Sequence, residues 1–308
     1  MGDVIHSLPV ASAIHESWPG TRLTWLIDPR WAPLLEGNSA VSAIHHFPRA
    51  SFRGFGGVFK ALAWYRSLGA LNPDVCVDLQ GLLRSGLMAR FSGSRRTIGL
   101  SDAREGASLF FNSVVSVAEG EHAVRRYLRC LPALGIPVPE EPKWVLPEGD
   151  PLPDFEMPEG AVILHPFARG SGKSMDENAI EEFAKSFRAI SNRPIIVVGG
   201  VSSASLSNEV IDLTGRTNLA QLIWVVRRAA FVVSVDSGPM HLASALGRPL
   251  LSIHTWTDPR LVGPYGKGAW IWQGGGIRMR DPFEPPLPEV PFTSRASGEI
   301  ARFVAKNC

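Results

Sequence analysis

Short apolar runs alternate with longer amphipathic stretches along this 308-residue chain, and this alternation limits its fold more than any other feature. β-branched and apolar residues dominate runs of strand length at residues 22–27, 41–47, 74–79, 161–165, 194–198, 231–235 and 249–253. The segments between them have the spacing of amphipathic helices, as in residues 176–190 and 219–228. Because strands that alternate with helices form parallel sheets covered by helices, the pattern predicts an α/β fold.

Prolines crowd residues 137–158 and interrupt the alternation once. So much proline prevents regular structure, and the chain is long enough for two domains of ordinary size. We therefore predict one Rossmann-like domain over residues 1–150 and a second over residues 151–308. A Gly- and Pro-rich segment at residues 263–291 precedes a helix-like tail, which we expect to pack across the domain junction. Ligands of such sheets bind at the carboxyl ends of the strands.

Composition excludes several classes of protein. The 31 Lys and Arg residues nearly balance the 29 Asp and Glu residues, so the chain lacks the overall positive field that attracts nucleic acid. The three cysteines are far apart, without the paired spacing of zinc or redox motifs. No apolar run approaches the roughly 20 residues of a membrane span. These observations predict a cytoplasmic protein that does not bind nucleic acid.

A strand-like run at residues 231–235 ends in a polar turn that opens a helix. Ser237 suits the helix cap, Gly238 allows close approach of a ligand, and Pro239 suits the first helical turn. Backbone N–H groups and the helix dipole would then favour an anion such as a diphosphate. Alternatively, this is an ordinary helix start whose side chains make structural hydrogen bonds. The candidate binding residues are Asp236, Ser237, Gly238, Pro239, Met240 and His241.

A second strand-to-helix junction, at residues 165–174, carries Lys173 on a glycine-containing loop. The ammonium group of Lys173 can neutralise phosphate charge on a leaving nucleotide, and Ser171 offers a hydroxyl group beside it. The loop does not match the triphosphate-binding motif, because Phe167 stands where that motif needs its first glycine. The alternative is a solvated lysine in a surface loop.

Asp3 opens the helix-like stretch that ends near Trp18, and it is either a general base or a helix cap. A carboxylate suits general base catalysis, because it can accept the proton that a hydroxyl nucleophile loses as it attacks.

Arginines are concentrated between residues 84 and 104, where the only acidic residue is Asp102. Guanidinium groups bind carboxylates and phosphates through two parallel hydrogen bonds, so the cluster predicts an anionic ligand. We expect Arg90 to be an ordinary solvated helix residue. The candidate ligand contacts are Arg84, Arg95, Arg96 and Arg104.

The histidines do not have the spacing of metal ligands. His45 and His46 are neighbours on a strand pattern and therefore point to opposite faces. His241, His254 and Asp258 are assigned structural roles, because no ligand spacing links them. We therefore expect neither a metal nor another cofactor.

Together, these segments resemble glycosyltransferase family 9, and within it the heptosyltransferase I branch of the lipopolysaccharide heptosyltransferases. The segments that carry the resemblance occur in the family's order, at residues 2–9, 77–85, 102–105, 122–127, 233–243 and 257–266. The resemblance implies a fold of GT-B type, with two Rossmann-like domains whose parallel sheets face a cleft. It also implies metal-independent transfer with inversion at the donor sugar.

The resemblance assigns roles to residues and partners. Asp3 matches the catalytic base, Lys173 matches a lysine that contacts donor phosphate, and Arg104 fits acceptor recognition in the N-terminal domain. The turn at residues 236–241 matches the donor-binding turn of the C-terminal domain. The implied donor is ADP-heptose, and the implied acceptor is the Kdo-containing inner core of lipopolysaccharide at the inner face of the cytoplasmic membrane. We expect a monomer.

Two departures from the family pattern leave alternatives open. Relatives carry a strand-forming segment before the Gly2-Asp3 pair, so we expect the N-terminal sheet to lack its first strand. Phe167 and Ala168 stand where hydroxyl side chains are expected, and Ser171 or backbone amides would replace them. The alternatives are a catalytically silent nucleotide-sugar binding module and a transferase for another nucleotide sugar. An NAD-dependent dehydrogenase is disfavoured, because no Gly-x-Gly-x-x-Gly sequence follows a strand and opens a helix.

Overall fold

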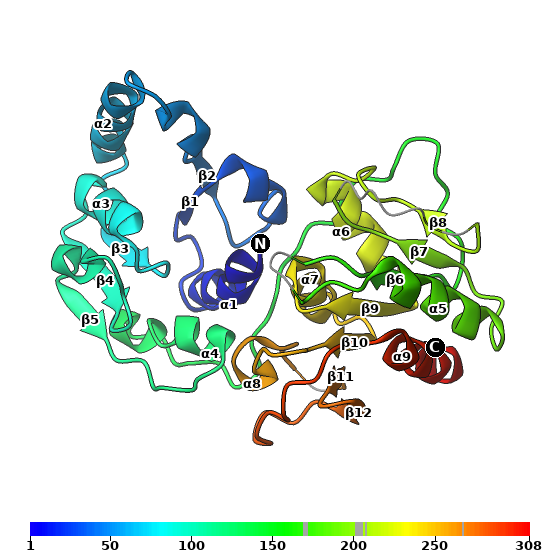
Figure 1. Cartoon of the computed structure of the whole chain (residues 1–308). Coiled ribbons are helices and arrows are strands. Elements are labelled where there is room, and N and C mark those ends of the chain that lie inside the picture. The colour runs from blue at the N-terminus through cyan, green and yellow to red at the C-terminus, as the bar shows by residue number, and fades with distance from the viewer. Residues whose placement is uncertain (169–171, 201–205, 207, 267) are drawn as a thin grey trace. The chain divides into compact units, whose positions relative to one another are not determined.

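The computed structural model describes residues 1–168, 172–200, 206, 208–266 and 268–308 (Figure 1). The chain divides into two compact units, and each is described by itself. The N-terminal unit contains His6–Val145, and the C-terminal unit contains Met1–Ile5 together with Leu146–Cys308. The division at Val145 and Leu146 lies inside the proline-rich stretch. Both units have parallel sheets, so the predicted α/β class is confirmed.

One sheet forms the centre of the C-terminal unit, with the strand order β12-β11-β10-β9-β6-β7-β8. Every pair in it is parallel except that of β11 and β12. Four of the strands, each confirming a predicted run, are β6 (Val162–His165), β7 (Ile195–Val197), β9 (Phe231–Val235) and β10 (Leu250–Ile253). The sequence pattern did not indicate β8 (Ile211–Asp212), β11 (Trp270–Gln273) and β12 (Gly276–Met279).

The hairpin of β11 and β12 lies within the Gly- and Pro-rich segment. Gln273 pairs with Gly276, so the turn consists of Gly274 and Gly275 alone. Both turn residues have positive φ angles, 63° and 83°, which the two-residue turns of tight hairpins require. The Gly-Gly pair shortly after the apolar run at residues 269–272 was the signal for this hairpin.

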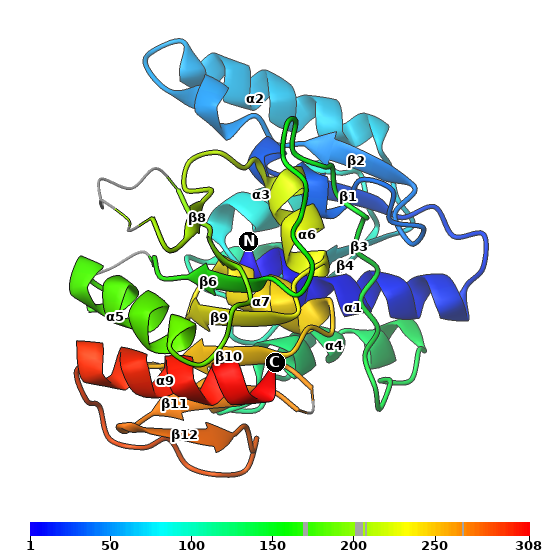
Figure 2. The same cartoon turned by 90° about the vertical axis from the view of Figure 1, so that its right-hand side faces the viewer.

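Helices cover the faces of this sheet. They are α5 (Glu177–Arg188), α6 (Leu219–Arg227), α7 (Gly238–Ala245), α8 (Pro259–Val262) and α9 (Ser294–Asn307). Figure 2 shows α5 and α9 side by side. The Ser297 hydroxyl group of α9 donates to the Ala179 carbonyl oxygen of α5 at 2.6 Å, and both helices contribute to the main hydrophobic core. We expected the C-terminal helix to pack across the domain junction, but its buried face lies on α5 of its own unit.

The N-terminal unit contains two separate parallel sheets. One pairs β1 (Thr24–Ile27) with β2 (Ala43–His46), and the other has the order β3 (Val75–Asp78), β4 (Arg96–Leu100), β5 (Ser113–Val115). Among the described residues, β1 and β3 therefore each have a strand partner on one side only. The helices are α1 (Gly2–Ser17), which begins in the other unit, α2 (Gly57–Ser67), α3 (Leu83–Phe91) and α4 (Ala123–Leu128). Among the described residues, no helix is both long enough and apolar enough to cross a membrane.

Candidate functional site

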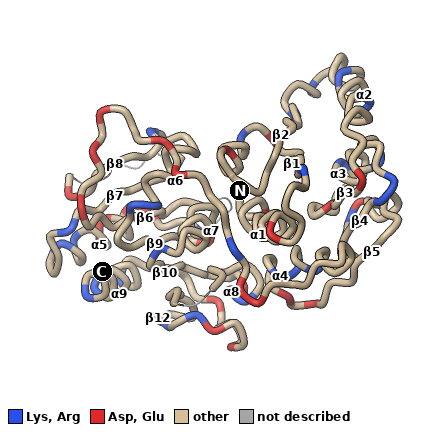
Figure 3. The backbone as a smooth tube through the Cα atoms, turned by 180° about the vertical axis from the view of Figure 1, so that it is seen from behind, with Lys and Arg blue, Asp and Glu red and all other residues tan. Residues whose placement is uncertain are grey.

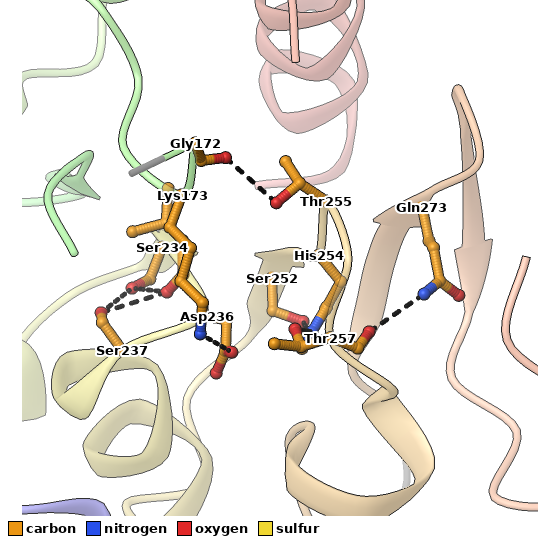
Figure 4. A network of polar contacts seen from close by, with 11 residues as sticks. Gly172, Lys173, Ser234, Asp236, Ser237, Ser252, His254, Thr255, Thr257 and Gln273 are labelled. Atoms are coloured by element: carbon orange, nitrogen blue, oxygen red, sulfur yellow. Dashed lines mark hydrogen bonds and ion pairs between the residues drawn. The ribbon is translucent and has the colours of Figure 1, made fainter. Parts of the chain in front are cut away.

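Three neighbouring strands of the C-terminal sheet end beside one another, and polar side chains follow each of them (Figure 4). β6 leads into the loop with Lys173, β9 into Asp236 and Ser237, and β10 into the segment at residues 254–258. Because the strands are parallel, their carboxyl ends meet at one edge of the sheet. The sequence predicted the first two groups as binding residues, and the structure brings these two groups together.

Lys173 and Asp236 form an ion pair at this edge. The Lys173 Nζ atom lies 2.9 Å from the Asp236 Oδ2 atom, and the two side chains are only 17% and 10% exposed. The ammonium group also lies 4.4 Å from the ring centroid of Trp256. Lys173 is therefore not a solvated surface lysine. Since an ammonium group has three donors, Lys173 can hold Asp236 and still donate to an anion.

Trp256 is a residue that the sequence analysis missed. It is half exposed, and its ring provides a negative face for the Lys173 ammonium group. Its position directly after β10, at the same sheet edge as Lys173 and Asp236, was the available signal.

The first turn of α7 lacks a side-chain cap. We predicted that Ser237 would cap it, but the Ser237 hydroxyl group lies 3.0 Å from His165 Nδ1 and donates to the Val235 carbonyl oxygen at 3.1 Å. Pro239 stands in the first turn as predicted, while Met240 is fully buried and contributes to packing. The N–H groups of an uncapped first turn, together with the helix dipole, suit a phosphate group.

The first residues of the chain lie against α7 within the C-terminal unit. A Cβ atom added at Gly238 would lie 2.8 Å from the Met1 Cε atom, and one added at Gly2 would lie 2.9 Å from His241 Cδ2. Asp3 therefore belongs to the same compact unit as Lys173 and Asp236, and it is exposed in the first turn of α1. Glycine at positions 2 and 238 permits this close packing.

A chain of hydrogen bonds fixes the segment that carries Trp256. The fully buried His254 ring contacts Ser252 Oγ through Nε2 and Thr257 Oγ1 through Nδ1, each at 3.0 Å. The Thr255 hydroxyl group donates to the Gly172 carbonyl oxygen at 3.1 Å, which joins this segment to the Lys173 loop. His254 therefore has the structural role that we predicted for it.

Burial lowers the pKa of both His165 and His254 to about 4. Neutral rings are therefore favoured in the folded protein, whereas unfolded histidine has a pKa near 6.5. The unfolded state then binds more protons than the folded state between pH 6.5 and pH 4. The contribution of these two histidines to the free energy of unfolding is therefore fully present above this window and is lost as the pH falls through it.

We therefore expect the free energy of unfolding to be lower at pH 5 than at pH 7, by on the order of 2 kcal/mol for each of the two histidines. Urea unfolding at both pH values measures this difference. The His165→Asn variant should show a smaller difference between the two pH values than the parent protein. An unchanged difference would contradict this assignment to His165.

The structure divides the predicted arginine cluster. Arg84 and Arg104 follow the carboxyl ends of β3 and β4. The backbone N–H group of Arg104 donates to the Gly81 carbonyl oxygen at 2.7 Å. Arg95 and Arg96 stand at the opposite end of β4, where the Arg96 guanidinium group donates to the Ala133 carbonyl oxygen. Only Arg84 and Arg104 therefore lie at the sheet edge where ligands of such folds bind.

One predicted site residue is not described, and one ion pair was not predicted. Ser171 lies outside the described residues, so its place in the candidate site stays a prediction. Asp102 and Arg126 form an ion pair through two hydrogen bonds, one of them 2.8 Å long, which the sequence analysis did not anticipate. Within the described residues, no group of three or more His, Cys, Asp or Glu side chains has an arrangement that could hold a metal ion.

Comparison with known proteins gives a consistent result. A family model described as glycosyltransferase family 9 (heptosyltransferase) matches residues 61–277. Lipopolysaccharide heptosyltransferase 1 of Salmonella typhimurium (strain LT2) is 30% identical over 87% of this chain and 89% of the relative. The enzyme of the same description from Escherichia coli O18:K1:H7 (strain RS218) is 29% identical over 91% of this chain and 90% of the relative.

Solved structures show the same fold. The structure titled E. coli heptosyltransferase WaaC with ADP-2-deoxy-2-fluoro heptose has a TM-score of 0.80 and 23% sequence identity. The match covers 100% of this chain and 96% of that chain. This likeness confirms the predicted α/β fold of GT-B type, with parallel sheets.

Proposed function

Since this chain belongs to glycosyltransferase family 9, the heptosyltransferase family, we propose that it transfers heptose from ADP-heptose to the Kdo-containing inner core of lipopolysaccharide. The observation that carries this proposal is the Lys173–Asp236 pair beside the uncapped start of α7. Relatives named as lipopolysaccharide heptosyltransferases, matched over most of their length, support the choice of sugar and acceptor.

The donor diphosphate binds between α7 and Lys173 in this proposal. Backbone N–H groups of the first turn of α7 and the Lys173 ammonium group both donate to phosphate oxygens. The same groups stabilise the charge that develops on ADP as its bond to the sugar breaks. Transfer then needs no metal ion, because the helix dipole and the ammonium group supply the positive charge.

Asp3 acts as the general base. Its carboxylate accepts the proton of the acceptor hydroxyl group while the hydroxyl oxygen attacks the anomeric carbon. The bond between this carbon and the diphosphate breaks on the opposite face, and the electron pair leaves with ADP. Attack from the face opposite the leaving group inverts the configuration of the sugar.

Arg84 and Arg104 recognise the acceptor. Kdo is a sugar acid, and guanidinium groups bind carboxylates through paired hydrogen bonds. Both arginines follow strand ends in the N-terminal unit, and Arg104 is exposed.

Release of ADP tests this function. The purified protein, supplied with ADP-heptose, is expected to release ADP only when a Kdo-containing acceptor is present, and mass spectrometry is expected to show one added heptose. Calorimetry with ADP provides the second measurement. Binding of ADP without transfer would overturn the enzymatic proposal in favour of a silent binding module, and turnover of another ADP-sugar alone would overturn the choice of heptose.

We also expect Trp256 to position Lys173 for the donor. A cation–π contact contributes about 0.5 to 2 kcal/mol, so Trp256→Leu should raise the KM for the donor by roughly tenfold. Trp256→Phe keeps an aromatic face and should raise this KM by less. Initial rates of ADP release at varied donor concentration measure both effects. Trp18→Leu, at an exposed tryptophan of the N-terminal unit, is the matched control. Equal KM values for the Leu and Phe variants would contradict the aromatic contact.

A further inference from the structure

The outer face of α2 and the turn just before it expose a group of large apolar side chains. They form what we call the α2 patch: Phe55, Val58, Phe59 and Leu62. Phe55 is fully exposed, and Phe59 is 77% exposed. A hydrophobic patch of this kind on a protein surface marks an interaction site more often than an isolated exposed residue does.

The packing of α2 turns this patch away from the N-terminal unit. Trp64 lies on the inner side, where its ring is 5.1 Å from that of Phe47 and 6.0 Å from that of Phe52. Gly57 is buried against the Phe52 backbone. With 3.6 residues per turn, Val58, Phe59 and Leu62 share a side of the helix that Gly57 and Trp64 do not. The helix therefore has one apolar face for its own unit and a second apolar face for a partner.

Positive charge surrounds the α2 patch. Residues 37–73 contain no Asp or Glu, and their cationic residues are Arg49, Arg53, Lys60 and Arg66. All four are exposed, and in the described part of the chain none lies within ion-pair distance of a carboxylate. Figure 3 shows blue but no red along α2. An anionic partner is therefore favoured over a neutral or cationic one.

We propose that the α2 patch docks this protein on an anionic membrane surface. Helices that bind at the membrane interface combine exposed Phe and Leu side chains with Lys and Arg beside them. The apolar side chains enter the boundary between headgroups and acyl chains, while the cations remain at the level of the acidic headgroups. This surface belongs to the N-terminal unit, whereas the candidate donor site belongs to the C-terminal unit. The inference goes beyond the proposed function, and it agrees with an acceptor that is anchored in a membrane.

Cosedimentation with vesicles tests the apolar half of the proposal. We expect the protein to bind vesicles of phosphatidylcholine mixed with phosphatidylglycerol more tightly than vesicles of phosphatidylcholine alone. The double variant Phe55→Ser and Phe59→Ser should weaken binding to the mixed vesicles by about a hundredfold, because each buried aromatic ring contributes roughly tenfold. The control double variant, Leu109→Ser and Phe283→Ser, removes side chains that are 85% and 89% exposed and should bind like the parent protein.

A charge variant tests whether the cationic side chains contribute to vesicle binding. The change of Arg53→Glu and Lys60→Glu should lower binding to the mixed vesicles by at least about twentyfold, because each cation near an anionic surface contributes roughly fivefold. Binding of the parent protein should also decrease as salt is added.

Three results would overturn the proposal. The first is equal binding of the parent protein to both kinds of vesicle. The second is unchanged binding to the mixed vesicles in the aromatic double variant. The third is that the parent protein does not bind vesicles but forms a concentration-dependent dimer, which the aromatic double variant does not form. Light scattering detects the third result, which would identify the patch as a contact between copies of the chain. ADP calorimetry on every variant tests the donor site separately, so a failure of the proposed transferase activity is distinguishable from a failure of membrane binding.

Discussion

Lys173→Ala is expected to lower kcat/KM for ADP release by about a hundredfold to a thousandfold, the usual effect of removing one group that stabilises developing charge. The change removes the ammonium group, and it also leaves the Asp236 carboxylate, which is 10% exposed, without its ion-pair partner. An unpaired carboxylate beside α7 repels a diphosphate. Calorimetry should therefore show weaker ADP binding in addition to slower turnover.

Lys185→Ala is the matched control, because Lys185 is an exposed lysine of the same unit in α5. Asp236→Asn combined with Lys173→Ala should recover part of the lost ADP affinity, since the repelling charge is then absent. If Lys173→Ala bound ADP as tightly as the parent protein, Lys173 would not contact the donor phosphates.

Asp3→Asn is expected to lower kcat by about a hundredfold to ten thousandfold, the range that a positioned general base contributes. The amide has nearly the same shape as the carboxylate but cannot accept the acceptor proton. ADP affinity should remain unchanged, because Asp3 does not contact the diphosphate in the proposed mechanism. Stopped assays of ADP release and calorimetry with ADP measure the two quantities separately.

Asp74→Asn, which changes an exposed carboxylate that follows α2 and precedes β3, is the control for this second experiment. An Asp3→Asn variant that turned over at the parent rate would remove Asp3 from the mechanism and leave the donor site intact. Loss of ADP binding in the same variant would instead indicate that Asp3 supports the packing of Met1 and Gly2 on α7.

Buried strands were the part of the fold that the sequence predicted best. β6, β9 and β10 are fully buried, and each consists of apolar residues except for one His or Ser, so these runs stand out from the surrounding helices. β8 escaped prediction because a strand of two residues has no pattern. β4 was not predicted, because Arg96 at its start and Gly99 within it interrupt the apolar pattern of a strand. The Phe111 ring packs against Gly99.

The candidate site was predictable residue by residue but not as a set of contacts. Lys173 and Asp236 each follow a strand, and this position identified both as candidates. Their ion pair joins residues 63 positions apart, and it depends on β6 and β9 being neighbours in the sheet, which no local pattern shows. The arginines that we predicted as one cluster are divided in the structure for the converse reason. Arg96 and Arg104 are close in sequence, but β4 separates them and places them at opposite ends of the sheet.

The two short sheets of the N-terminal unit have a consequence for handling the protein. In the part of the chain that the structure describes, β1 and β3 each have one side along which no strand pairs with their backbone N–H and C=O groups. A synthetic extended peptide with alternating apolar residues can add to such a side by β-augmentation. An extended segment of a second chain has the same backbone groups as that peptide, so we expect any association at high concentration to begin along β1 or β3.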